Sequence, residues 1–153
     1  DTPKMKVEPK QPMILTIGYE GRDIDDFLNT LLKEGVQVLL DVRYNPFSMN
    51  FSFTKNKLKK YLENVGVEYV HIPELGIRGE LRKNLATKKS YGELFEKYKE
   101  MIVQHHKKDI QKIIELGKNK RIALMCFEHS EEMCHRGIIS DYLEAHSAGV
   151  MHI

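Results

Sequence analysis

Residues Met13–Tyr19 read MILTIGY, a short and nearly continuous apolar run without the alternation of apolar and polar residues that marks a half-exposed strand. Further runs of the same character are Val36–Arg43, Val67–Pro73, Ile122–Glu128 and Val150–Ile153. Strands of this kind are typical of parallel sheets that are covered on both faces. The segment therefore predicts a buried strand, with helices expected between it and the later runs.

Apolar residues at helical spacing fill the intervals between these runs. The segments with this spacing are Ile24–Leu32, Leu58–Val65, Leu94–Ile114 and Ile138–Leu143. Asp23 and Thr54 stand where N-caps are expected, and Gly35, Gly66 and Gly117 stand where the helices are expected to end. The alternating order predicts an α/β fold over residues 13–153: a single three-layer, doubly wound domain with about five mainly parallel strands and helices on both faces.

The remaining composition excludes several classes of protein. Residues 1–12 hold three of the five prolines and predict a flexible N-terminal tail, and no charged segment followed by an apolar one suggests a signal peptide. No apolar run approaches the roughly 18 residues of a membrane span. The formal net charge is only +2, and the two cysteines cannot form a secreted disulfide framework. We therefore expect a cytoplasmic protein with no membrane partner.

Arginines are concentrated in the loops that follow the predicted strands. Five of the six lie in these loops or at their borders, namely Arg22, Arg43, Arg78, Arg82 and Arg136. Ligands of such sheets bind at the carboxyl ends of the strands, and the guanidinium fork pairs with phosphate or with carboxylate. The pattern therefore indicates either an anion-binding edge or structural ion pairs with carboxylates such as Asp41 and Glu128.

The connection after Arg43 is rich in aromatic residues, with Tyr44, Phe47, Phe51 and Phe53. Such side chains can stack on a base or a sugar ring, or they can pin the loop to the core. Phe53 lies beside the Thr54 cap and is expected to act as a hydrophobic staple for the following helix.

The segment from Cys126 to Arg136 carries the densest chemistry of the chain, and three interpretations compete. Cys134 is a nucleophile if a helix N-terminus and Arg136 stabilise its thiolate. Alternatively, Cys126, Glu128, Cys134 and His135 supply ligands to a soft metal, although their spacing is not that of a zinc finger. In the third interpretation the cysteines are buried and structural, and Arg136 binds an anion or a carboxylate.

Four motifs follow one another in the chain: TIGYEG at 16–21, LDVR at 40–43 with Pro46 and Ser48, YVHIPELG at 69–76, and Cys126–Glu128 with CHR at 134–136. In this order they resemble the family named domain of unknown function 488. The resemblance implies an α/β domain whose signature residues gather at one sheet edge, and it implies no settled reaction. Carried over by position, the signature residues are Gly18, Tyr19, Asp41, Arg43, Pro46, Ser48, Leu75, Gly76, Cys126, Glu128, Cys134, His135 and Arg136. Members of the family continue a little past the last strand, so this chain is expected to stop short at Ile153.

Taken together, these patterns predict a protein that binds a small anionic ligand, of the phosphate-bearing class, at the carboxyl edge of its sheet. The predicted ligand-binding residues are Tyr19, Arg22, Arg43, Ser48, Gly76, Cys126, His135 and Arg136. If the protein is an enzyme, Cys134 is the candidate nucleophile, and Asp41 or Glu128 is the candidate general acid or base. Neither a metal nor a cofactor is predicted.

A non-catalytic nucleic-acid-binding module is the alternative. It would use the loop from Arg43 to Phe53 together with the lysine-rich helix that carries Lys55, Lys57, Lys59 and Lys60. The sequence decides neither between these classes nor on the ligand or the oligomeric state.

Overall fold

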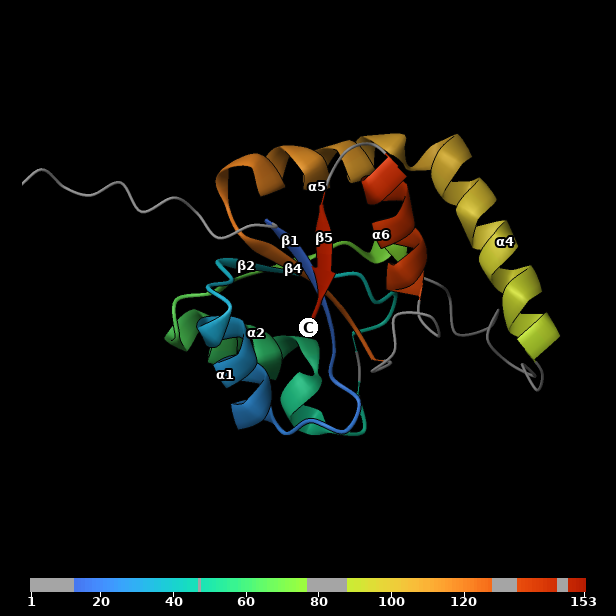
Figure 1. Cartoon of the computed structure of the whole chain (residues 1–153). Coiled ribbons are helices and arrows are strands. Elements are labelled where there is room, and N and C mark those ends of the chain that lie inside the picture. Colours follow the sequence, from blue (N-terminus) through green and yellow to red (C-terminus); the bar gives the residue numbers. More distant parts are fainter. Residues whose placement is uncertain (1–12, 47, 77–87, 128–134, 146–148) are drawn as a thin grey trace, which may run out of the picture.

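The computed structural model of the chain describes residues 13–46, 48–76, 88–127, 135–145 and 149–153. In these residues one five-stranded sheet has the order β3-β2-β4-β1-β5, and all paired strands are parallel (Figure 1). The strands are β1 (Ile14–Gly18), β2 (Val38–Asp41), β3 (Glu68–His71), β4 (Ile122–Cys126) and β5 (Val150–His152). The predicted α/β fold is confirmed, and each predicted run contains one strand.

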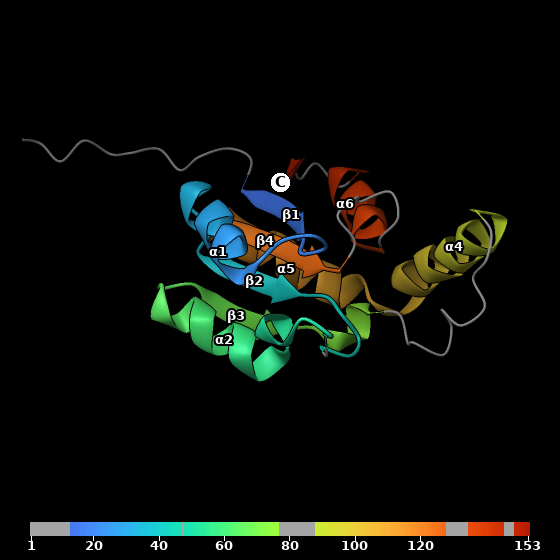
Figure 2. The ribbon, with the colours of Figure 1, turned by 90° about the horizontal axis from the view of Figure 1, so that it is seen from below.

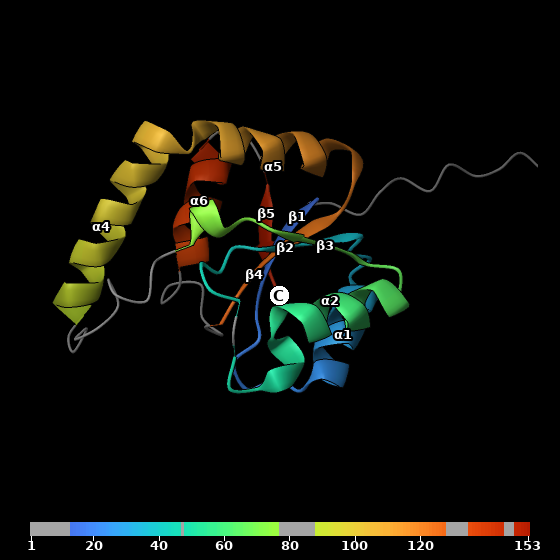
Figure 3. The same ribbon diagram turned by 180° about the vertical axis from the view of Figure 1, so that it is seen from behind.

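Helices cover both faces of the sheet. On one side lie α1 (Ile24–Lys33) and α2 (Lys55–Asn64), and on the other lie α5 (Lys107–Asn119) and α6 (His135–Ala145) (Figures 1 and 3). Helix α4 (Lys88–His105) packs against α5 and α6 and extends away from the sheet (Figure 2). Two short 3-10 helices, η1 (Phe51–Phe53) and η2 (Pro73–Leu75), follow β2 and β3. Within the described ranges, no helix combines the length and the apolarity needed to cross a membrane.

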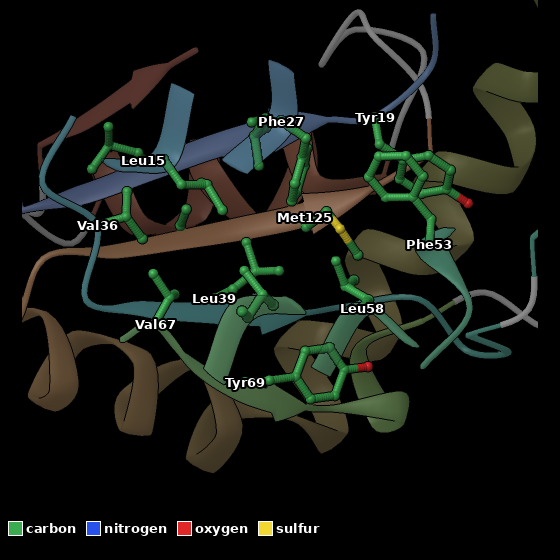
Figure 4. Packing of buried hydrophobic residues seen from close by; sticks show 14 residues of the cluster. Leu15, Tyr19, Phe27, Val36, Leu39, Phe53, Leu58, Val67, Tyr69 and Met125 are labelled. Carbon is green, nitrogen blue, oxygen red and sulfur yellow. The ribbon is translucent and has the colours of Figure 1, made fainter. Parts of the chain in front are cut away.

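Each face of the sheet has its own hydrophobic core. Alternate residues of the buried strands point to opposite faces, so Leu15, Leu39 and Met125 pack against α1 and α2 (Figure 4). Their neighbours Ile14 and Leu40 pack on the other side, against α5 and α6. This division explains the unbroken apolar runs of the sequence, because both sides of each strand are covered.

The boundaries of α1 and α2 agree with the predicted caps and ends, and only the capping hydrogen bond of α2 is missing. Asp23 caps α1, since its carboxylate accepts a hydrogen bond of 2.7 Å from the backbone N–H of Asp26. Thr54 occupies the N-cap position of α2, but its hydroxyl makes no capping hydrogen bond. Gly35 and Gly66 follow α1 and α2 with positive φ, as expected for residues that end helices.

The expectation of one long helical stretch ending at Gly117 is wrong in two respects. The stretch is interrupted at His106, which precedes α5 and whose Nδ1 lies 3.0 Å from a carboxylate oxygen of Asp109. Helix α5 then continues past Gly117 to Asn119. Gly117 is buried within α5, where a Cβ atom would come within 2.9 Å of the Ile14 side chain, so this glycine permits close packing of the helix on β1.

Candidate functional site at the carboxyl edge of the sheet

The carboxyl ends of four strands meet at one edge of the sheet. Gly18 of β1 is in register with Cys126 of β4, while Asp41 of β2 is in register with both Met125 of β4 and His71 of β3. The chain leaves β1 and β2 toward α1 and α2, whereas it leaves the central strand β4 toward α6 on the opposite face (Figure 1). In sheets of this kind, ligands bind at the carboxyl ends of the strands where the connections diverge to opposite faces.

A buried ion pair stands at the end of β2. Nε and Nη2 of Arg43 donate hydrogen bonds of 2.9 and 2.7 Å to the two carboxylate oxygens of Asp41. Asp41 is fully buried and Arg43 is 6% exposed. Asp41 is thus the carboxylate with which Arg43 forms an ion pair.

Asp41 accepts two further hydrogen bonds. Its Oδ1 accepts from the backbone N–H of Arg43 at 3.1 Å, and its Oδ2 accepts from the hydroxyl of Tyr69 at 2.6 Å. Tyr69 belongs to β3 and was not among the predicted site residues, although its hydroxyl stands out within a buried apolar run. Each carboxylate oxygen of Asp41 thus has two donors, which offset the cost of burying its charge.

The remaining hydrogen bonds of Arg43 hold the loop that follows β2. Its Nη1 donates to the hydroxyl of Tyr19 at 3.3 Å and to the backbone carbonyl of Phe53 at 2.8 Å. The Tyr19 ring stacks on the ring of Phe53 with a centroid distance of 4.5 Å, and the guanidinium carbon lies 5.3 Å from the Tyr19 ring centroid. Phe53 also meets Phe27 of α1 edge to face, so it pins the loop to the core as expected.

The environment of the ion pair shifts two pKa values. Burial alone lowers the pKa of Arg43, but the hydrogen bond and the negative charge of Asp41 outweigh it, so this pKa is raised. The pKa of Tyr69 is raised as well, first by burial and then by the negative charge of Asp41 and the hydrogen bond to it. Both groups therefore keep their protons throughout the physiological range.

His71 of β3 and Gly76, which follows η2, support this network. Nε2 of His71 lies 2.7 Å from the backbone oxygen of Arg43, and Gly76 packs directly on the backbone of Tyr44. A Cβ atom on Gly76 would lie 2.1 Å from the backbone nitrogen of Tyr44. Gly76, a predicted ligand-binding residue, is thus placed where two segments of backbone approach each other closely.

A second group of predicted residues lies on the other face of the sheet. Cys126 belongs to the core on the side of α5 and α6, and it is disulfide-bonded. Nη1 of Arg136, in the first turn of α6, lies 3.1 Å from the Cys126 sulfur, and Arg136 is 1% exposed. Tyr19 belongs to the core on the side of α1 and α2. The structure therefore brings the predicted residues together in two groups, one with Tyr19, Asp41 and Arg43 and the other with Cys126 and Arg136.

Arg22 and Ser48 make hydrogen bonds outside these two groups. Arg22 donates to the hydroxyl of Thr30 at 3.0 Å and to the backbone oxygen of Ile153 at 2.6 Å. The buried hydroxyl of Ser48 accepts a hydrogen bond of 3.2 Å from the backbone N–H of Asn50. Arg22 thereby connects the loop after β1 with the last residue of the chain, and Ser48 orders a turn in the loop after β2.

Some predictions fall outside the described residues. They concern the tail at residues 1–12, Phe47, Arg78, Arg82, Glu128 and Cys134, together with the side chain of His135. Their assigned roles stay predictions. Among the residues that are described, no three His, Cys, Asp or Glu side chains gather as a metal ion would require.

Among the described residues of the loop after β2, three large apolar side chains are exposed. Tyr44, Met49 and Phe51 are 42, 85 and 60% exposed, respectively. Nζ of Lys57, in the first turn of α2, lies 5.8 Å from the centroid of the Phe51 ring. The aromatic loop therefore divides into a buried anchor, Phe53, and an exposed apolar surface beside a lysine.

Comparisons with known proteins place the chain in one family. The family described as Domain of unknown function DUF488 matches residues 23–143. No curated protein and no solved structure matches the chain. The match begins just before α1, ends within α6 and includes the Asp41–Arg43 pair, Gly76, Cys126 and Arg136. The chain therefore belongs to the DUF488 family, as its four motifs suggested.

Proposed function

We propose that this protein binds a small anionic ligand, of the phosphate-bearing class, at the carboxyl edge of β1, β2 and β4, with Arg136 as its principal contact. One observation carries the proposal: the Arg136 guanidinium is buried in the first turn of α6, beside the end of the central strand. The N-terminal turn of a helix presents backbone N–H groups and a partial positive charge, which favour an anion at the same place.

The topology supports the same location. Strand β4 lies between β1 and β2, and its connection crosses to the opposite face from theirs. Two of the buried charged residues at this edge are arginines, Arg43 and Arg136, and one is the carboxylate of Asp41. The edge therefore combines the position and the positive charge that an anion site needs.

Arg43 serves the proposed site as a positioning residue. Four of its hydrogen bonds go to Asp41, Tyr19 and Phe53, so it ties the ends of β1 and β2 to the loop that follows β2. Catalysis by Cys134, with Glu128 or Asp41 as general acid or base, stays a prediction of the sequence. Asp41 itself is fully buried and accepts four hydrogen bonds, which suits an anchor for Arg43.

A thermal-shift series with phosphate, sulfate and nucleoside monophosphates tests the proposal. A ligand at 100 times its Kd stabilises the native state by about 2.7 kcal/mol, which raises Tm by roughly 5 °C or more in a chain of this length. We expect such a shift in the wild type and its loss in Arg136→Gln. Arg121→Gln is the matched control, because Arg121 is a buried arginine at the amino end of β4, paired with Glu34.

The shift should survive in Arg121→Gln, measured against that variant's own ligand-free Tm. If none of these anions shifts the wild type, or if the shift persists in Arg136→Gln, the proposed site is wrong.

The exposed surface of Tyr44, Met49 and Phe51 favours a second candidate function, binding of single-stranded nucleic acid. Exposed aromatic rings stack on bases, and the nearby lysines of α2 would contact the phosphate backbone. Fluorescence anisotropy with a labelled oligonucleotide should then show salt-dependent binding that Phe51→Ala weakens by about fivefold or more, since one stacked base contributes about 1–3 kcal/mol. Leu32→Ala, at an exposed apolar residue of α1, should leave the affinity unchanged. Equal affinities of both variants would exclude this surface.

A further inference from the structure

An exposed aromatic ring stands at the end of the central strand. Phe127 directly follows β4 and is 45% exposed, although Cys126 before it is 1% exposed. The backbone of Phe127 is nevertheless fixed, since its carbonyl accepts a hydrogen bond of 2.8 Å from the N–H of Glu20, in the loop after β1. Phe127 thus stays attached to the sheet edge while nearly half of the residue is exposed.

The aromatic residues that Phe127 contacts set the orientation of its ring. The ring centroid lies 5.3 Å from that of Tyr19, with an angle of 70° between the ring planes. Tyr19 is itself held in place, because it is 4% exposed and stacks on Phe53 (Figure 4). A T-shaped contact uses either the edge or one face of a ring. Tyr19 therefore leaves at least one face of the Phe127 ring uncovered.

Phe127 and Arg136 lie at the end of β4 on opposite faces of the sheet. Cys126, whose sulfur lies 3.1 Å from Nη1 of Arg136, packs on the side of α5 and α6. The Phe127 ring contacts Tyr19, which packs on the side of α1 and α2. Consecutive Cα atoms are only about 3.8 Å apart, so both contacts belong to one strand end. A ligand held by Arg136 would therefore reach the ring across the carboxyl end of β4.

We propose that the anion bound at this edge is a nucleoside monophosphate, whose phosphate contacts Arg136 and whose base stacks on Phe127. The inference rests on the proposed anion site and names its class of ligand. In a nucleoside monophosphate the sugar separates the phosphate from the base, which suits two contacts on opposite sides of a strand end. Aromatic side chains stack on any base, because every base has a π face. Phe127 is thus the residue that distinguishes a nucleotide from other phosphates.

Isothermal titration calorimetry with AMP and ribose 5-phosphate tests the inference, because the two ligands share the phosphate and the sugar and differ in the base. We expect the wild type to bind AMP about fivefold to a hundredfold more tightly than ribose 5-phosphate, which corresponds to one stacked base. Phe127→Ala should remove this difference by weakening the binding of AMP alone. Phe127→Tyr should retain the difference, since an aromatic ring remains.

Phe51→Ala is the matched control, because Phe51 is a 60% exposed phenylalanine that follows β2 rather than β4. It should leave both affinities unchanged. If Phe127→Ala does not fold, as judged by circular dichroism, Phe127→Leu takes its place. Leucine keeps an apolar side chain at this position but offers no aromatic face, so AMP should again bind no more tightly than ribose 5-phosphate.

Two results would overturn the inference and leave the anion site in place, provided that Arg136→Gln still abolishes the binding of both ligands. One is equal affinity of the wild type for AMP and ribose 5-phosphate. The other is a folded Phe127→Ala or Phe127→Leu variant that binds AMP as tightly as the wild type does. If neither ligand binds the wild type, the proposed anion site is wrong and the inference fails with it.

Discussion

Asp41 anchors the part of the candidate site that lies on the side of α1 and α2. Its carboxylate is fully buried, and a buried charge is costly unless it is paired and hydrogen-bonded. Arg43 supplies the charge and Tyr69 the last donor, from a neighbouring strand. The loss of either partner therefore leaves a carboxylate with unsatisfied oxygens, and the consequences differ because one partner is charged and the other is neutral.

Removal of Arg43, the charged partner of Asp41, should strongly destabilise the folded protein. We predict that Arg43→Met lowers the free energy of unfolding by about 3–5 kcal/mol, since it leaves an uncompensated buried charge. The double variant Asp41→Leu, Arg43→Met should recover a large part of this loss because no charge remains buried. Urea unfolding of both variants measures the difference. As a control, Lys59→Met breaks an exposed ion pair with Glu63 and should cost less than about 1 kcal/mol.

If the double variant is no more stable than Arg43→Met alone, the cost does not come from the unpaired charge of Asp41.

Tyr69, the neutral partner of Asp41, makes the free energy of unfolding depend on pH at high pH. The pKa of Tyr69 is raised in the folded protein, so the folded state keeps this proton above pH ~10, where an unfolded tyrosine loses it. The unfolded state then binds fewer protons, and the free energy of unfolding falls as pH rises, by up to about 1.4 kcal/mol per pH unit from this group. Denaturant unfolding between pH 8 and pH 11 measures the slope.

Tyr69→Phe should make the slope shallower, although it also lowers stability at neutral pH through the lost hydrogen bond. Tyr61→Phe, at an exposed tyrosine of α2, should retain the wild-type slope. Identical slopes in the wild type and in Tyr69→Phe would show that Tyr69 does not retain its proton in this range.

At the scale of elements, the backbone at the end of η2 packs directly against the backbone of the loop after β2. Leu75 is fully buried, its carbonyl accepts a hydrogen bond from the Tyr98 hydroxyl of α4, and Gly76 meets the backbone of Tyr44. The ends of β2 and β3 are thereby tied together and connected to the helical layer. A side chain at position 76 has no room unless one of these segments moves.

Gly76→Ala should therefore lower the free energy of unfolding by about 3 kcal/mol or more, because its Cβ would collide with backbone rather than with a flexible side chain. Gly92→Ala is the matched control: no atom lies within 4 Å of its added Cβ, and it stands inside α4, where alanine should stabilise by about 0.5–1 kcal/mol. Thermal unfolding of the two variants should move Tm in opposite directions. A Gly76→Ala variant as stable as the wild type would contradict the described packing.

The elements themselves could be predicted because the local signals were strong. The run from Ile122 to Cys126 is buried on both faces, and the Asp23 cap begins α1 where its carboxylate indicated. The interruption at His106 was not predictable from spacing, since the apolar pattern continues across it from α4 into α5. The role of Gly76 was also missed, because close approach depends on a partner 32 positions away in the sequence.

At the scale of the molecule, strand order and register decide which predicted residues meet. The alternation of side chains along a strand could assign Asp41 and Leu40 to opposite faces. Tyr69 reaches Asp41 because β3 pairs with β2. Arg136 reaches Cys126 because α6 covers β4. The sequence thus predicted that these residues lie near one sheet edge, whereas their division between the two faces of the sheet needed the three-dimensional arrangement.

Titration of the isotopically labelled protein with phosphate, followed by amide NMR, tests the central claim most directly. The account predicts saturable shifts in the amide signals of Gly18, Cys126 and Arg136 at the carboxyl edge, with those of Gln37 and Arg121 at the amino edge unchanged. Arg136→Gln should abolish the shifts. Shifts of equal size at both edges, or no saturable shift at the carboxyl edge, would contradict an anion site there.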